Sequence, residues 1–149
     1  MTGKCTVGML ARSGALAAVG SVLLLCGCSK TAEDLSKPSH MFDVLSKTWA
    51  EAKATLQTDK PSLGQVAAVE NVLYGPMRRT IEQEYTGPSK AEVLKKYDAL
   101  AEGFKANVTP MLGRTGVAVV LNPGYTNQNV RDAFVKLDAD FAALIKAAQ

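Results

Sequence analysis

Cysteine and histidine are scarce in this chain of 149 residues, and their positions limit the chemistry it can carry. The three cysteines, Cys5, Cys26 and Cys28, lie near the amino terminus, and His40 is the single histidine. A domain formed by the rest of the chain therefore has no cysteine with which to build a disulfide. The same scarcity excludes zinc sites of the Cys/His type and iron or copper sites that need two histidines.

A large excess of charge of one sign is also missing. Lys4 and Arg12 lie in a stretch without acidic residues, and the chain from residue 28 onward holds 15 basic and 14 acidic residues. Proteins bind nucleic acid through a clustered basic face that releases counterions. Here Lys and Arg alternate with Asp and Glu along the chain, which is typical of solvated helix surfaces, so we expect no nucleic-acid partner.

The amino-terminal apolar stretch is too short for a membrane-spanning helix. Residues 1–12 form a positively charged start, and residues 13–25 form an uncharged apolar stretch of about a dozen residues. A helix needs roughly 20 apolar residues to cross a bilayer, and Arg12 prevents extension of this stretch toward the amino terminus. These dimensions are typical of an export signal.

The sequence Leu25-Cys26-Gly27-Cys28 resembles the lipobox of bacterial lipoproteins, in which an aliphatic residue, a small residue and Gly or Ala precede an invariant cysteine. The resemblance implies that diacylglycerol is attached to the Cys28 thiol and that a peptidase cleaves between Gly27 and Cys28. It covers only the leader, and Cys26 replaces the commoner Ala, Ser or Thr. The alternatives are an uncleaved anchor or an ordinary signal peptide that is cleaved near Gly27.

The resemblance divides the chain into a signal peptide at residues 1–27, a lipidated flexible tether at residues 28–38 and a helical domain at residues 39–149. Acyl chains on Cys28 would hold the domain on a membrane, because each buried methylene contributes about 0.8 kcal/mol. The residue that follows Cys28 is Ser29. An Asp at this position would resemble the signal that retains lipoproteins in the inner membrane of enterobacteria. We therefore expect the periplasmic face of the outer membrane in a host with two membranes, and otherwise the outer leaflet of the cell membrane.

Apolar residues recur at intervals of three and four after the tether, which is the pattern of amphipathic helices. We predict four helices, at residues 39–58, 62–85, 89–109 and 127–148. Gly75-Pro76 predicts a kink or a short interruption in the second helix, because proline removes one hydrogen bond and clashes with the preceding turn. Short links between the first three helices favour antiparallel neighbours, so the predicted fold is an all-α antiparallel four-helix bundle.

Helix start signals accompany three of these segments. Ser39 follows Pro38 and is a candidate N-cap for the first helix. Ser62 with Gln65 and Ser89 with Glu92 match the capping-box pattern, in which two side chains bind the free N–H groups of the first turn. These signals place the beginnings of the second and third helices.

Residues 113–126 do not follow the helical pattern. Val117–Leu121 is apolar and rich in β-branched residues, with glycines before it and Asn122-Pro123-Gly124 after it. This segment is compatible with a short strand or with the extended part of a crossover loop. Because a lone strand leaves its backbone groups unpaired, we favour an irregular crossover or one more helical turn.

Candidate reactive residues are few. Covalent haem attachment needs Cys-x-x-Cys-His, haem ligation in a bundle needs a histidine in the last helix, and a di-metal site needs Glu-x-x-His pairs. The sequence has none of these three. We expect His40 to be exposed. Glu82 and Glu84, like Asp138 and Asp140, are two residues apart and point in different directions on a helix. We therefore predict no catalytic, cofactor-binding or metal-binding residue.

The aromatic residues have two interpretations. Trp49 lies on the apolar stripe of the first helix, which favours a place in the core over a ligand-stacking role. Four tyrosines can place their hydroxyls at helix ends or mouths, where we favour a core edge over a groove for a peptide or lipid: Tyr74, Tyr85, Tyr97 and Tyr125. Arg78 and Glu82 are four residues apart on a predicted helix, a spacing that favours an exposed ion pair. This pair accounts for the Arg78-Arg79 dipeptide without a phosphate ligand.

Two hypotheses about function follow, and an enzyme is less favoured than either. The first is an envelope lipoprotein with an interaction or structural role toward another envelope protein or the cell wall. The second is a module that binds a small apolar ligand or a peptide between its helices. Gly75-Pro76 and the Val117–Leu121 segment suggest the second, because both interrupt regular helix packing.

Overall fold

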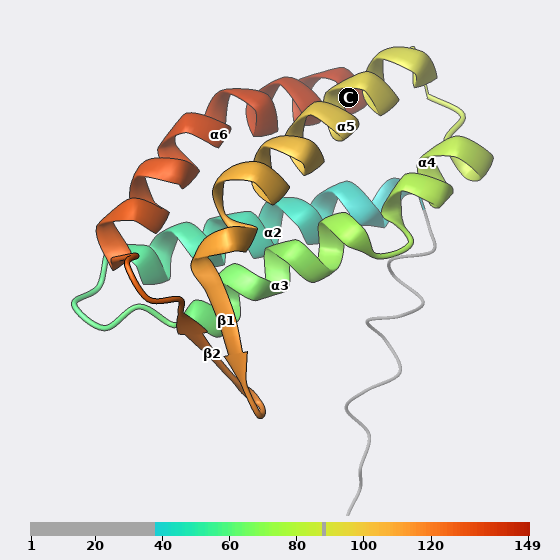
Figure 1. Cartoon of the computed structure of the whole chain (residues 1–149). Helices are drawn as coiled ribbons and strands as arrows, with labels where there is room; N and C mark the ends of the chain where they lie inside the picture. Colours follow the sequence, from blue (N-terminus) through green and yellow to red (C-terminus); the bar gives the residue numbers. More distant parts are fainter. Residues whose placement is uncertain (1–37, 88) are drawn as a thin grey trace, which may run out of the picture.

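The computed structural model describes residues 38–87 and 89–149 (Figure 1). The predicted signal peptide, Cys28 and the tether up to residue 37 lie outside these described residues. The described part is mostly helical, with one small sheet. Its elements in chain order are α2 (Pro38–Leu56), α3 (Leu63–Tyr74), α4 (Met77–Glu84), α5 (Lys90–Asn107), the short 3₁₀ helix η1 (Thr109–Met111), β1 (Leu112–Thr115), β2 (Ala118–Leu121) and α6 (Asn127–Ala148).

The helices confirm the prediction from apolar spacing. The predicted helices at 39–58, 89–109 and 127–148 correspond to α2, α5 and α6. The predicted helix at 62–85 corresponds to α3 and α4 together. Each observed end lies within two residues of the predicted one, because the same apolar stripes that predict the helices face the core.

Of the two outcomes predicted at Gly75-Pro76, a kink or a short interruption, the structure shows the interruption, which separates α3 from α4. Pro76 has no N–H group to continue the hydrogen bonding of α3. A side chain at position 75 would place its Cβ 2.7 Å from the Asn71 carbonyl oxygen, so only glycine fits this bend without a backbone shift. The chain resumes a helix at Met77.

The predicted caps are only partly right. Ser39 lies within α2 and is therefore not its N-cap. Ser62 and Ser89 do occupy the N-cap positions of α3 and α5, but neither side chain makes a capping hydrogen bond. Ser62 instead donates its N–H to Thr55 Oγ1 at 2.7 Å, and Ser89 has a left-handed backbone with φ of 55°. Both capping boxes are thus wrong, although the helix positions are right.

A capping box does form at the start of α6. The Thr126 N–H donates to Asn129 Oδ1 at 2.8 Å, and the Asn129 N–H donates to Thr126 Oγ1 at 3.3 Å. The third position of this box holds Asn rather than the usual Glu or Gln. The usual sequence signature of a capping box is therefore absent here, and this box was not predicted.

The irregular crossover predicted for residues 113–126 is wrong over its first part, which forms a β-hairpin. β1 and β2 pair in antiparallel fashion, with Leu112 opposite Leu121 and Thr115 opposite Ala118. Gly116 adopts a positive φ of 62° in the two-residue turn, a conformation that suits a tight hairpin. The prediction failed because it considered Val117–Leu121 as a lone strand, whereas the preceding residues supply its partner.

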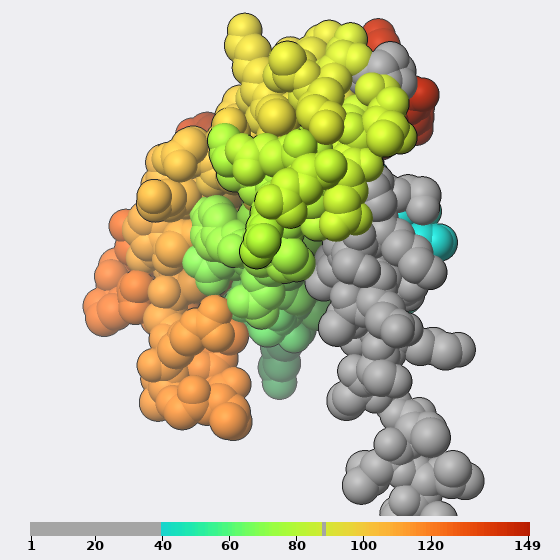
Figure 2. All heavy atoms as spheres, turned by 90° about the vertical axis from the view of Figure 1, so that its right-hand side faces the viewer, coloured from blue at the N-terminus to red at the C-terminus, as the bar shows by residue number. Residues whose placement is uncertain are grey.

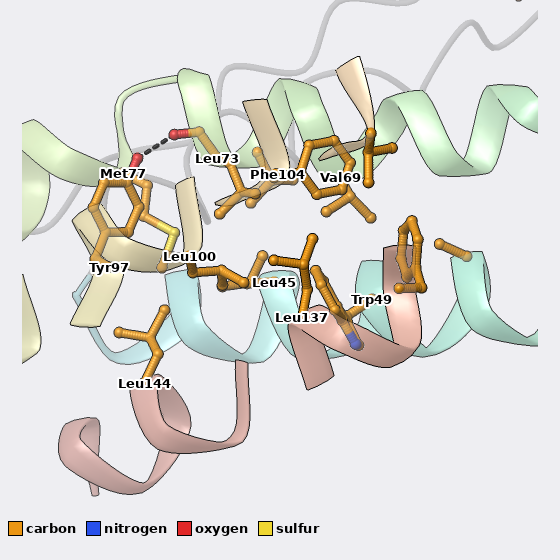
Figure 3. Close-up of a cluster of buried hydrophobic side chains, with 14 of the residues drawn as sticks. Leu45, Trp49, Val69, Leu73, Met77, Tyr97, Leu100, Phe104, Leu137 and Leu144 are labelled. Carbon is orange, nitrogen blue, oxygen red and sulfur yellow. Dashed lines mark hydrogen bonds between the residues drawn. The ribbon is translucent and has the colours of Figure 1, made fainter. Parts of the chain in front are cut away.

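One core of apolar side chains joins all the helices (Figure 3). Trp49 is only 2% exposed, which confirms its predicted place in the core. Its ring packs against the rings of Phe104, Phe134 and Phe141. The largest fully buried side chains come from all five α-helices of the described residues and include Trp49, Phe104, Phe134, Leu73, Met77 and Leu144.

Two sets of contacts define the ends of this helical body. The Tyr85 hydroxyl donates to the Ala148 carbonyl oxygen at 3.3 Å, and its ring meets that of Phe42 edge-on. At the other end, Arg131 donates to the carbonyl oxygens of Leu56 and Thr58. The start of α2 thus lies near the end of α6, and the end of α2 lies near the start of α6. The hairpin extends from the helices beside α3 (Figure 1).

Candidate functional site

An open groove of about 920 Å³ lies between the broken α3–α4 segment and α5. Figure 2 views the molecule from the side on which α4 and the first turns of α5 face the reader. The α3–α4 wall presents Glu70, Tyr74, Arg78, Arg79 and Glu82. The α5 wall presents Tyr97, Asp98, Ala101, Glu102 and Lys105. Because the groove brings aromatic and charged side chains of two helical segments together at the surface, we treat it as the candidate site.

Tyr97 joins the two walls at the break. Leu73 belongs to the last turn of α3, whose carbonyl oxygens have no partner within the helix. The Tyr97 hydroxyl donates a hydrogen bond to the Leu73 carbonyl oxygen (Figure 3). Tyr97 is 2% exposed, and burial, which disfavours the charged phenolate, raises its pKa to about 12. This buried bond therefore holds α5 against the end of α3.

Tyr74 forms a second link between the walls but keeps its ring partly open. Its hydroxyl lies 3.3 Å from the Ala101 carbonyl oxygen, to which it donates, and 3.4 Å from Thr109 Oγ1. The side chain remains 45% exposed. Partial burial raises the pKa of Tyr74, and the nearby carboxylates of Glu70 and Glu102 raise it further. The result is an aromatic ring in a fixed position on the rim of the groove.

Arg78 crosses the groove from α4 to α5. Its Nε donates to Asp98 Oδ1 at 2.9 Å and one Nη donates to Asp98 Oδ2 at 3.3 Å, a two-point contact that fixes the guanidinium plane. Arg78 also pairs with Glu82 one turn along α4, as predicted from the sequence. The Asp98 contact was not predicted, because 20 residues separate the two side chains.

The remaining charges of the groove are less constrained. Glu70 pairs with Arg114 of β1 at 3.4 Å, and Arg79 donates to Gln83 at 3.2 Å. Among the residues that the structure describes, Glu102 and Lys105 form no ion pair. Charges of both signs thus remain available to a partner at the rim.

The four predicted tyrosines divide between two places. Tyr74 and Tyr97 come together in the groove, as the groove interpretation expects. The Tyr85 hydroxyl binds the carbonyl oxygen of Ala148 at the end of α6, and Tyr125 is partly exposed just before α6. The prediction that tyrosine hydroxyls lie near helix ends is confirmed for Tyr85 and Tyr97.

A polar network that the sequence did not predict links α2 to α6. The Trp49 indole N–H donates to Asp138 Oδ1 at 3.0 Å, and the Lys53 ammonium donates to Asp138 Oδ2 at 2.5 Å. Burial by itself would raise the pKa of Asp138, but the bonds from Lys53 and Trp49 and the Lys53 charge outweigh it, so the pKa is lowered. These partners are more than 80 residues apart, which explains why no local pattern revealed them.

The other predicted residues do not assemble into a reactive site. His40 is exposed, as expected. Glu82 pairs with Arg78, and Asp138 belongs to the α2–α6 network, so neither shares a site with its neighbour two residues away. Within residues 38–87 and 89–149, no group of three or more His, Cys, Asp or Glu is placed to hold a metal ion.

Comparisons with known proteins add no family to these observations. No protein-family model matches the chain, and no match was found among curated proteins or solved structures. In the described part of the chain, every helix falls short of the length or apolarity that a bilayer crossing requires. The groove and the amino-terminal sequence are therefore the features that bear on function.

Proposed function

We propose that this protein is a lipoprotein of the bacterial cell envelope whose helical domain has an interaction or structural role. Cleavage between Gly27 and Cys28 removes the signal peptide, and acyl chains on Cys28 hold the domain on a membrane. The lipobox-like sequence and the short apolar stretch before it support this anchor. The membrane is the outer membrane, at its periplasmic face, in a host with two membranes and the cell membrane otherwise.

We further propose that the domain is an antiparallel four-helix bundle in which α3 and α4 together serve as the second helix. The contacts of Tyr85 with Ala148 and of Arg131 with Leu56 support opposite directions for α2 and α6. The bundle is a rigid body, because one continuous core joins its helices. A rigid body on a lipid anchor suits a protein that presents a surface to a partner.

The groove is the observation that carries the interaction role. Its walls are held together by the Tyr97 hydroxyl, the Tyr74 hydroxyl and the Arg78–Asp98 contact, so its shape exists before a partner arrives. Such preorganisation lowers the entropy cost of binding. Its rim exposes an aromatic ring and unpaired charges, which a purely structural body does not require. We therefore propose the groove as the surface that meets an envelope partner.

A peptide-binding module is the second candidate, and the same groove favours it. The break at Gly75-Pro76 opens the groove at the surface, whereas the interior is filled by large side chains such as Trp49 and Phe104. A rim that carries charges of both signs suits a peptide better than a wholly apolar small molecule. This proposal assigns no catalytic residue and no cofactor.

The anchor is tested by the intact mass of the protein purified from bacterial membranes. We expect acyl mass on Cys28 and an amino terminus at that residue. Cys28→Ser should leave an uncleaved precursor without detergent-phase partitioning, whereas Cys26→Ser, as the matched control, should mature normally. A Cys28→Ser protein that is cleaved and acylated as before would refute the anchor.

The interaction role is tested by photo-crosslinking in intact cells. A photoreactive residue at Lys105 lies in the groove, and one at Lys136 lies on the exposed surface of α6. We expect a discrete crosslinked species from position 105 and none from position 136. Equal crosslinking from both positions, or none from position 105, contradicts a role for the groove.

A further inference from the structure

We infer that the end of the groove beside the hairpin binds a lysine or arginine side chain of a partner polypeptide, between the Tyr74 ring and the carboxylates of Glu70 and Glu102. This inference rests on the proposed interaction role and specifies the chemistry of the partner. It is carried by three observations: the exposed ring, the two carboxylates and an arginine of the chain itself that already lies there.

The Tyr74 ring supplies a fixed aromatic face. Its hydroxyl is held by the Ala101 carbonyl oxygen and lies beside Thr109 Oγ1, so the ring cannot rotate away without losing these contacts. Tyr74 is nevertheless 45% exposed and is one of the residues that line the groove. An aromatic face attracts an ammonium or guanidinium group through its negative quadrupole, and no similar attraction exists for a carboxylate.

The carboxylates of Glu70 and Glu102 make this end of the groove negative. Both line the groove together with Tyr74, and both raise the pKa of the Tyr74 hydroxyl. Arg79 and Lys105 also line the groove, and by themselves they would favour an acidic partner. Glu70 lines the hollow that Tyr74 also lines, whereas Arg79 and Lys105 are not among the residues that line this hollow. The local charge therefore complements a cation.

Arg114 shows that a guanidinium fits beside these groups. One of its Nη atoms lies 3.4 Å from Glu70 Oε2, and a hollow that continues the groove is lined by Glu70, Tyr74, Gly75 and Arg114. The contact is long, and the Arg114 side chain is 61% exposed, whereas that of Glu70 is 15% exposed, so the arginine is the partner that can move away into solvent. Arg114 is thus a cation that a partner can displace, and its removal should strengthen binding.

The test uses the mature, lipid-bearing protein in detergent micelles and three fluorescein-labelled heptapeptides. The peptides are identical except for three positions, which hold lysine, glutamine or glutamate. Fluorescence anisotropy should show the lysine peptide binding about tenfold more tightly than the glutamate peptide, with an affinity that falls at high salt. Arg114→Gln should tighten the lysine peptide by about threefold, because Glu70 becomes free.

Glu102→Gln supplies the decisive variant, with Glu51→Gln on the exposed surface of α2 as its matched control. We expect Glu102→Gln to weaken the lysine peptide by about fivefold and Glu51→Gln to leave it unchanged. Both side chains are exposed, and equal thermal unfolding of the two variants would exclude loss of fold as the cause.

Three outcomes would overturn the inference: equal effects of the two glutamate variants, no binding of any peptide, or tighter binding of the glutamate peptide. The last would assign recognition to Arg79 and Lys105 instead. Failure of this inference can be distinguished from failure of the proposed function, because crosslinking from Lys105 in cells and acyl mass on Cys28 do not depend on the charge of the peptide.

Discussion

The two sides of the helical body are held together by different forces. Between α2 and α6, the Trp49 ring stacks on Phe141 with a centroid separation of 4.7 Å and an interplanar angle of 2°. Between the α3–α4 segment and α5, the groove separates the outer surfaces, and hydrogen bonds from Tyr97 and Arg78 span the gap. Apolar burial stabilises the first side, to which Trp49 and Lys53 add bonds to Asp138, whereas directional polar bonds give the groove on the second side its shape.

The largest expected effect comes from the α2–α6 side. Trp49→Ala removes the ring at the centre of the aromatic cluster and should lower the free energy of unfolding by about 3–5 kcal/mol. Urea denaturation followed by circular dichroism measures this loss. Val135→Ala on the outer surface of α6, where the side chain is 69% exposed, should change little. A Trp49→Ala protein that unfolds like the parent would show that the ring is not part of the core.

Alkaline pH should weaken the groove side selectively. The folded-state pKa of Tyr97 is about 12, above the ordinary value of 10, so folding favours the protonated hydroxyl. Its contribution is complete below pH 10 and is lost as the pH rises through 12, a decrease of about 3 kcal/mol in the free energy of unfolding. Urea denaturation at a series of pH values measures this decrease.

Tyr97→Phe separates this contribution from other alkaline effects. The variant cannot ionise at position 97, so it should lack the extra loss of stability between pH 10 and 12. At neutral pH it should be less stable by about 1–3 kcal/mol, because the Leu73 carbonyl oxygen loses its partner. Tyr125→Phe, which changes a partly exposed tyrosine, is the control. Equal pH profiles for Tyr97→Phe and the parent would contradict the role of this hydroxyl.

A smaller effect is expected at Asp138. Its lowered pKa means that the ionised form is favoured in the folded state, so its contribution is present near neutral pH and is lost as the pH falls through the folded-state pKa. Asp138→Asn should remove this acid sensitivity and cost up to about 1 kcal/mol at neutral pH. Acid titration of tryptophan fluorescence, compared with Asp140→Asn, measures it. Identical acid transitions in the two variants would argue against the network.

The smallest effect is expected at Asp98 on the groove side. Asp98→Asn weakens an exposed contact with Arg78, and such pairs contribute about 0.2–1 kcal/mol. Thermal unfolding should therefore shift little, while backbone amide signals of α4 and α5 should change in NMR spectra. A destabilisation as large as that of Trp49→Ala would contradict the proposed difference between the two sides.

The sequence predicted elements better than it predicted contacts between them. The apolar stripes located every helix, and Gly75-Pro76 located the break, because these signals depend on residues within one or two turns. The hairpin was missed because Gly113 and Arg114 interrupt any apolar alternation in its first strand. The bonds that join the walls of the groove were not predicted, because they connect residues 20 or more positions apart. The break offered one signal. It leaves carbonyl oxygens at the end of α3 without partners in the helix, so a donor side chain from another element is required.

The sequence alone determines the order and extent of the helices and the break between α3 and α4. It also predicts the leader with Cys28, which stays a prediction. Each is a local pattern, since a helix repeats every 3.6 residues and a lipobox occupies four consecutive positions. Only the tertiary structure reveals the pairing of β1 with β2 and the Trp49–Asp138 bond. It also brings Tyr74, Glu70 and Glu102 together around one groove. Packing decides these contacts, because the helix faces that meet depend on how all the apolar surfaces are buried together.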